Sequence, residues 1–390
     1  MYKRQTGYSD WTPRLLRAAY NYQVYLKDPG AFAHNAKYMI QLLHDSIVDL
    51  NTVIADNAYA LSDSLRNDKG HFDGAGPAAR NWDAQASGTV TAACSKCHGG
   101  SEGLTYYLSK GVESPTGTEQ DNGLDCATCH TSFGTTAPVR LVDSVKFPGA
   151  TATFSFGTTE TPDKMTNLCA TCHSGRESKA TIDKYIADQQ AASKALAFRN
   201  VHYYPAAGTI AGSAGGVGYE YAGKTYRGTR NHAAIANKTG CVACHAPGAN
   251  LHSFQVSDNA GECTACHGSV TSAAQLTSIR GSAREGVNYD GDAATTTLAA
   301  ELQGLAAKLL TQMQALAPTL CYDGHAYPYF GKCGGGSFTG WTDKLVRAAH
   351  NYQLSQKDPG AWAHNFSYVA QLLYDSIEDL GGSLTGLTRP

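Results

Sequence analysis

Apolar residues recur at helical spacing in the clearest patterned stretch of the chain, residues 294–316. Leucines and one methionine return there every three or four positions, which is the period of a single helix face. Polar and small residues fill the positions between them. The pattern predicts an amphipathic helix whose stripe packs into a protein core rather than around a cofactor: Leu298, Leu302, Leu305, Leu309 and Met313.

A second helical pattern occurs twice. The stretch Trp11 to Leu50 aligns without gaps on Trp341 to Leu380, with 26 of 40 positions identical. Each copy is predicted to be a helical hairpin. The first helix should end near Lys27, because Asp28-Pro29-Gly30 breaks a helix. The second helix carries apolar residues on one face, at Met39, Leu43, Ile47 and Leu50.

The repeat has two interpretations that the sequence leaves open. In one, the hairpin is a duplicated packing element. In the other, each hairpin marks a junction between consecutive units. Those units would be tandem modules of a larger protein or subunits of a head-to-tail polymer, because a heterologous contact that does not close produces a fibre.

Alternation of β-branched and aromatic residues predicts little sheet. Two short strands are expected within residues 136–158, and a hairpin with a glycine turn is expected over residues 219–226. These segments lie between the two copies of the helical repeat. Sheet is therefore expected to be a minor part of the fold.

Composition narrows the class of protein. Of the 390 residues, 42% are hydrophobic and 16% are charged, which excludes a coiled coil, a collagen-like fibre and a highly charged disordered chain. No apolar run of eighteen residues occurs, so no transmembrane helix is predicted. The formal net charge of −2 shows none of the excess positive charge that is typical of nucleic-acid-binding proteins.

Ten of the twelve cysteines fall into five copies of the pattern C-x-x-C-H. Two thiols three positions apart on a helical turn can each add to one haem vinyl group, and the next histidine then becomes the proximal iron ligand. A zinc ribbon requires no histidine after each cysteine pair, and a ferredoxin cluster requires more closely grouped cysteines. The sequence therefore predicts five covalent haems c, at Cys94, Cys97 and His98; Cys126, Cys129 and His130; Cys169, Cys172 and His173; Cys241, Cys244 and His245; and Cys263, Cys266 and His267.

Covalent haem attachment takes place outside the cytoplasm, so an exported protein at the cell surface or in the extracellular space is expected. Residues 1–7 contain no apolar stretch and are not predicted to be a signal peptide. The chain is therefore expected to be a mature or truncated form, or a segment of a longer protein. Cys321 and Cys333 lie outside the haem motifs and are predicted to form a disulfide, with two free thiols as the alternative.

Nine histidines outside the motifs could supply distal ligands, enough for every haem to be six-coordinate and low-spin with two histidines. Four lie in loop-like contexts within or just before the motif region and are the expected distal ligands: His71, His202, His232 and His252. Three histidines are candidates for the fifth distal position: His34, His364 and His325. His34 and His364 occupy the same position in the two hairpin copies and could instead cap the second helix. The last two, His44 and His350, are each replaced by tyrosine in the other copy and are expected at the surface.

The chain resembles the multihaem c-type cytochromes of anaerobic, metal-reducing microbes, and among them a group of large secreted cytochromes. The resemblance rests on the five C-x-x-C-H sites, on the hairpin motif Lys-Asp-Pro-Gly-Ala-x-Ala-His-Asn, on Cys169-Ala-Thr-Cys172-His173-Ser-Gly-Arg-Glu-Ser and on Gly70-His71-Phe72-Asp73-Gly74. It implies a fold of coil, short helices and a few short strands organised around five haems, with a related hairpin at each end. The expected divisions are 1–55 (first hairpin), 56–290 (haem-bearing body), 291–320 (amphipathic helix) and 321–390 (disulfide loop and second hairpin).

The resemblance also implies a function. Electrons would pass along five bis-histidine haems to redox partner proteins or extracellular acceptors, and some cytochromes of this kind assemble head-to-tail into filaments, or nanowires. The alternative is a multihaem reductase of a small oxyanion with one open haem. Some of those enzymes mark the open haem with C-x-x-C-K, which does not occur in this chain.

Overall fold

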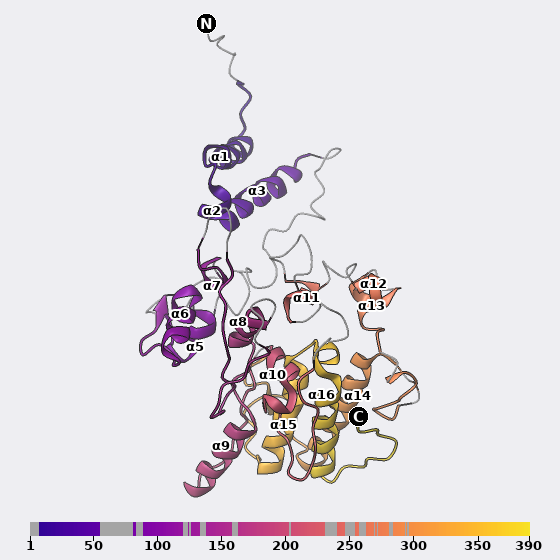
Figure 1. Ribbon diagram of the computed structural model, residues 1–390. Helices are drawn as coiled ribbons and strands as arrows, with labels where there is room; N and C mark the ends of the chain where they lie inside the picture. The colour runs from indigo at the N-terminus through magenta and orange to yellow at the C-terminus, as the bar shows by residue number, and fades with distance from the viewer. Residues whose placement is uncertain are drawn as a thin grey trace. The chain divides into compact units, whose positions relative to one another are not determined.

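The computed structural model describes the chain (Figure 1) except for residues 1–7, 55–80, 83–88, 120–123, 125, 133–137, 158–162, 203, 231–239, 246–253, 257–262, 269, 271, 281–283, 293 and 295. The chain divides into two compact units, Met1–Thr128 and Cys129–Pro390. Coil and helices dominate both units, and the described strands are short, as predicted. Within the described ranges, no helix is both long and apolar enough to cross a membrane.

The first unit begins with the predicted hairpin. Helix α1 (Pro13–Lys27) starts behind Thr12, whose hydroxyl accepts a hydrogen bond from the Leu15 N–H, and it carries proline in its first turn. The helix ends at Lys27, which confirms the predicted end. The one-turn helix α2 (Ala31–His34) and the longer α3 (Ala36–Asn51) follow.

The rest of the first unit is built around the first haem motif. The strands β1 (Thr89–Val90) and β2 (Thr118–Glu119) pair antiparallel and flank α5 (Ala92–His98) and α6 (Gly100–Lys110). Helix α6 lies so close to α5 that a Cβ atom at Gly103 would stand 2.0 Å from the Ser95 carbonyl oxygen. Only glycine allows this approach.

The core of the second unit is formed by three helices that lie side by side (Figure 1): α14 (Leu298–Leu316), α15 (Asp343–Lys357) and α16 (Ala361–Asp379). All five residues of the predicted α14 stripe are buried, which confirms that prediction. Helix α10 (Ala206–Ala211) packs against α16. The second hairpin copy thus supplies two of the three core helices.

The remaining elements of the second unit are short. Helices α8 (Met165–Cys172) and α9 (Lys179–Ala191) precede α10. The 3₁₀ turn η3 (Gly212–Ala214) follows it, and α11 (Val242–His245), α12 (Thr264–His267) and α13 (Ala273–Leu276) come later. Helix α7 (Cys126–Cys129) spans the division between the two units.

Two expected strand regions are not strands in the described residues. Within residues 136–158 only isolated bridges form, from His130 to Val139 and from Val145 to Phe154. Residues 219–226 turn at Gly223 but form no ladder. Their main-chain groups bond to helix side chains instead: the N–H and C=O of Tyr219 both pair with Asn351. Tertiary bonds have replaced the predicted hairpin.

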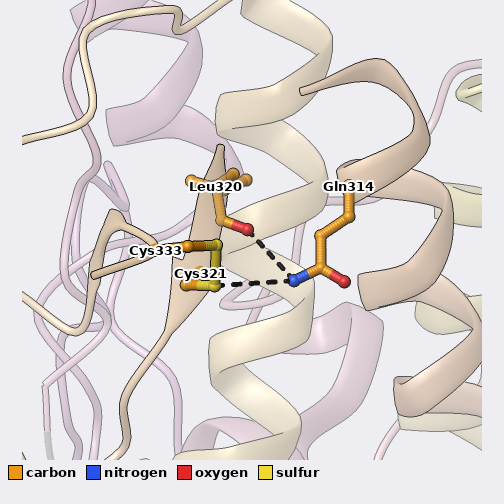
Figure 2. The surroundings of a disulfide bond; sticks show 4 residues. All are labelled: Gln314, Leu320, Cys321 and Cys333. Atoms are coloured by element: carbon orange, nitrogen blue, oxygen red, sulfur yellow. Dashed lines mark hydrogen bonds between the residues drawn. A yellow bond between two sulfur atoms is a disulfide. The ribbon is translucent and has the colours of Figure 1, made fainter. Parts of the chain in front are cut away.

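Cys321 and Cys333 are joined by a disulfide between β3 (Leu320–Tyr322) and β4 (Phe330–Lys332), which pair antiparallel. Figure 2 shows the Gln314 side chain of α14 beside this link, where its amide donates to the Leu320 carbonyl over 3.0 Å. The same amide approaches the Cys321 sulfur at 3.9 Å. The disulfide therefore ties the two strands of the ribbon together, and Gln314 joins this ribbon to the core helix.

Replacing both cysteines by serine (C321S/C333S) is expected to lower the free energy of unfolding by about 3 kcal/mol, because the link closes a loop of about a dozen residues in the unfolded chain. Urea unfolding of the variant and of the parent measures the difference. A reductant should destabilise the parent and leave the variant unchanged. Equal unfolding midpoints for parent and variant would contradict this role.

Candidate haem sites

Each of the five C-x-x-C-H motifs lies on a short helix, as the attachment chemistry requires. Two cysteines at this spacing project from one helical turn, with the histidine directly after them. In the first unit, the buried Trp82 ring lies against the His98 ring, with centroids 5.0 Å apart. The motifs are carried by α5, α7, α8, α11 and α12.

Two motif histidines are oriented by main-chain carbonyl groups. The Nδ1 atom of His173 lies 2.9 Å from the Tyr204 carbonyl oxygen, and that of His245 lies 2.9 Å from the Phe254 carbonyl oxygen. Because a carbonyl only accepts, each Nδ1 carries the proton and each Nε2 keeps its lone pair. This is the arrangement by which proteins prepare a histidine to bind a metal through Nε2.

A third histidine is prepared in the same way by a carboxylate. The Nδ1 atom of His364, in the first turn of α16, lies 2.8 Å from Oδ1 of the buried Asp358. The ring lies close to the backbone of the preceding turn. A Cβ atom at Gly360 would stand 2.6 Å from its Cε1 atom, so glycine is required there. The Nε2 atom of His364 is left to face a ligand.

The rings of His245 and His364 lie at the centroid separation expected for two ligands of one iron. Their ring centroids are 6.3 Å apart and their planes are inclined by 38°. Two imidazoles that bind one metal from opposite sides, with metal–nitrogen bonds of about 2.0 Å, place their centroids roughly 6.3 Å apart. The donor atoms and their spacing therefore fit a bis-histidine haem.

Two haem motifs separated by 72 residues meet in space. The thiols of Cys169 and Cys241 lie close enough for each to shift the pKa of the other, and the Cys241 N–H donates to the Thr166 hydroxyl over 3.3 Å. Helix α8 is itself anchored by the buried Asn167, whose amide donates to the Val142 carbonyl over 2.9 Å. The third and fourth haem motifs thus form one cluster.

The electrostatics of this cluster favour neutral motif histidines. Burial lowers the pKa of both His173 and His245, because a buried imidazole loses the hydration of its charged form. Burial alone would also lower the pKa of His364, but the negative charge and hydrogen bond of Asp358 raise it above its ordinary value. Burial likewise opposes the charge of Asp358, yet His364 holds the pKa of that carboxyl below its usual range.

Comparison with known proteins agrees with this chemistry. The chain is 30% identical over 356 residues to the C-type polyheme cytochrome OmcB of Geobacter sulfurreducens, in strains DL-1/KN400 and PCA. It is a homologue of polyheme c-type cytochromes. The match to OmcB covers 76% of this chain and 44% of the relative. The C-type polyheme cytochrome OmcC of the same organism is 29% identical over 364 residues, which covers 76% of this chain and 43% of the relative.

The homology supports a multihaem cytochrome with haem c as its cofactor. The chain spans less than half the length of the curated relatives it matches. No protein-family model matches the chain, and no solved structure matches it.

The other histidines of this cytochrome homologue are placed as follows. His71, His232 and His252 lie outside the described residues. His202 is half-buried and its backbone adopts a positive φ of 73°, with its N–H donating to the Asn200 side chain over 2.8 Å. His325 is exposed in the loop between β3 and β4.

The expectation that His350 lies at the surface is wrong. It is completely buried in α15, and its Nε2 donates to the Val217 carbonyl over 2.8 Å. His44, for which the same was expected, is only 16% exposed. The prediction for both histidines rested on the tyrosine that occupies the corresponding position of the other hairpin copy. Tyr20, the counterpart of His350, is 69% exposed, so the same repeat position is buried in one copy and exposed in the other.

Sequence reasoning missed Asp358 as the partner of His364. A signal was present, because both hairpin copies retain the aspartate and the histidine at the same separation, as Asp28 and His34 in the first copy. The carbonyl groups of Tyr204 and Phe254 gave no signal. Any residue type provides a carbonyl, so no side-chain pattern marks these contacts.

Proposed function

We propose that the chain carries five haems c and passes electrons among them, with two histidines on each iron. The five motifs provide five attachment sites, and the homologues are polyheme cytochromes. Haem iron supplies one-electron exchange between the ferric and ferrous states. The role of the protein is to hold the irons in fixed positions, with both axial coordination positions of each iron occupied.

The observation that carries the proposal is the pair His245 and His364, whose ring centroids are 6.3 Å apart. The two rings have the separation of axial ligands, and each has its Nδ1 held by a different partner, so that Nε2 is the donor on both sides. His364 is accordingly proposed as the distal ligand of the haem bound at Cys241 and Cys244. An iron with two strong axial ligands has no open coordination position for a substrate.

The proximity of the Cys169 and Cys241 thiols supports transfer between two haems. Each cysteine would bond to a vinyl group at the edge of its own macrocycle. Adjacent sulfur atoms would therefore bring two macrocycle edges together. Close edges favour electron exchange, because electronic coupling decays steeply with distance.

The proposed distal ligands for the other four haems are His71, His202, His232 and His252. With His364 they complete five bis-histidine irons. Neither His34 nor His325 is then needed for an iron of this chain.

We also propose that the protein acts at the cell surface or outside the cell, since its cofactors are attached outside the cytoplasm. Redox proteins or extracellular acceptors are the proposed partners. The repeated hairpin supports assembly into a series of haem-bearing units, either as tandem modules or as copies joined head-to-tail in a filament.

Haem counting and spin-state measurement test the proposal. Intact mass should show five covalently attached haems. Low-temperature EPR of the oxidised protein should integrate to low-spin ferric iron only. A high-spin signal equal to about one haem would identify an open iron and favour the reductase alternative, and a mass with fewer haems would contradict the count.

A further inference from the structure

The turn between α15 and α16 orients histidines that belong to two different haem sites. The Lys357 carbonyl accepts a hydrogen bond from the Tyr204 N–H over 3.0 Å, and the Tyr204 carbonyl in turn accepts from Nδ1 of His173 over 2.9 Å. The next residue of the turn, Asp358, binds Nδ1 of His364. One turn is therefore linked both to the proximal histidine of the third haem motif and to the proposed distal ligand of the fourth haem.

The groups that bind these histidines differ in charge. His173 and His245 each donate to a neutral main-chain carbonyl, whereas His364 donates to a carboxylate. Both carboxylate oxygens of Asp358 lie within hydrogen-bond distance of the His364 Nδ1 atom, at 2.8 and 3.0 Å. A full negative charge thus lies directly behind a ligand of the fourth haem, and only a carbonyl dipole lies behind the proximal ligand of the third.

The carboxylate of Asp358 is buried. Its side chain is 2% exposed, and its Oδ1 atom accepts a hydrogen bond from the Gly360 N–H over 3.2 Å. The adjacent Lys357 places its ammonium group over the Tyr329 ring, 3.8 Å from the ring centroid. Charges interact more strongly in a protein interior than in water. The carboxylate should therefore respond strongly to any change of charge at the neighbouring iron.

Oxidation and reduction change the charge of a haem, because the ferric form carries one more positive charge than the ferrous form. A buried carboxylate behind an axial histidine favours the ferric form, since it attracts that charge and makes the imidazole a stronger donor. We propose that Asp358, acting through His364 as a positioning residue, lowers the reduction potential of the fourth haem. This inference rests on the proposed function, in which His364 binds the iron of that haem.

The lowered potential has a consequence for the neighbouring haem. The proximity of Cys169 and Cys241 brings the third and fourth haems together. Transfer within this pair oxidises the ferrous fourth haem and reduces the ferric third haem, with one electron moved and no proton or covalent bond changed. Asp358 shifts this equilibrium toward an oxidised fourth haem and a reduced third haem. The aspartate thereby gives a direction to electron flow within the cluster.

Anaerobic spectroelectrochemical titration of the fully loaded protein at neutral pH measures the midpoint potentials of its haems. The D358N variant loses the charge but keeps a side-chain oxygen that accepts from Nδ1 of His364. One midpoint should rise, because the ferric-to-ferrous equilibrium constant of that haem changes by about tenfold, which is about 59 mV for a one-electron couple. Every haem of D358N should stay low-spin by EPR. Unchanged midpoints in D358N would overturn the inference.

The first hairpin provides a matched control. There Oδ1 of Asp28 lies 2.8 Å from Nδ1 of His34, whose side chain is 69% exposed. D28N therefore removes the corresponding carboxylate from a histidine that is not proposed to bind an iron of this chain, and it should leave every midpoint unchanged. D358E, which keeps the charge, should retain a midpoint close to that of the parent. A rise in either variant equal to that in D358N would overturn the inference.

Two further measurements assign the effect and separate it from the proposed function. In C241A/C244A, which lacks the fourth haem, adding D358N should leave the remaining midpoints unchanged, and a shift there would contradict the assignment to that haem. A high-spin iron in D358N would overturn the inference, since Asp358 would then be needed for ligation itself. Failure of the proposed function would appear in the parent, as a high-spin iron or a low haem count before any aspartate is replaced.

Discussion

Replacing His364 by alanine is expected to convert about one-fifth of the haem iron in the oxidised protein from low-spin to high-spin. The substitution removes the imidazole that faces His245 at 6.3 Å between ring centroids. The cysteine linkages are untouched, so the haem content should not change. Quantitative EPR of H364A and of the parent, at equal haem concentration, measures the effect.

Added imidazole provides the control for H364A. It should enter the space left by the side chain and restore the low-spin signal, which a general disturbance of the fold would not allow. H325A should leave every haem low-spin, because the His325 side chain is exposed in a loop. If H364A remained entirely low-spin while H325A gave a high-spin iron, the assignment of the distal ligand would be wrong.

The C241A/C244A variant is expected to lose one haem and about 4 kcal/mol or more of the free energy of unfolding. A missing haem leaves a far larger cavity than a Leu→Ala substitution, which itself costs about 2–5 kcal/mol. It also leaves the buried Asp358 and His364 without the group they surround. Intact mass gives the haem loss, and denaturant unfolding gives the stability.

The matched control is C126A/C129A, which removes a different haem and keeps the pair His245 and His364. Hydrogen exchange should show a loss of protection in α16 for C241A/C244A and unchanged protection there for C126A/C129A. Equal exchange in α16 for the two variants would contradict the view that the fourth haem is built into the core helices.

The local features of this protein were predictable because they depend on neighbouring residues. The end of α1 at Lys27 follows from Asp28-Pro29-Gly30. The buried stripe of α14 follows from leucines at helical spacing. The motif cysteines lie on helical turns because their spacing matches the period of a helix. In each case the residues that form the pattern lie within a few positions of the structural feature that they predict.

Other predictions failed where distant segments compete for the same groups. Residues 219–226 have the composition of a β-hairpin, yet Asn351, 132 residues away in sequence from Tyr219, takes the main-chain bonds that a ladder would have used. His350 is buried for the same reason, since its partner is the Val217 carbonyl. Local propensity cannot report a bond whose partner is more than a hundred residues away.

The sequence by itself determined the cofactor chemistry, since ten cysteines and five histidines at this spacing specify covalent haem attachment. It also determined that the hairpin occurs twice and that a histidine and an aspartate recur in both copies. Only the tertiary structure decided between otherwise equivalent histidines. It brought His364 to face His245 and left His34 exposed, because axial ligation depends on the positions of two imidazoles in space, and chain folding sets those positions across more than a hundred residues.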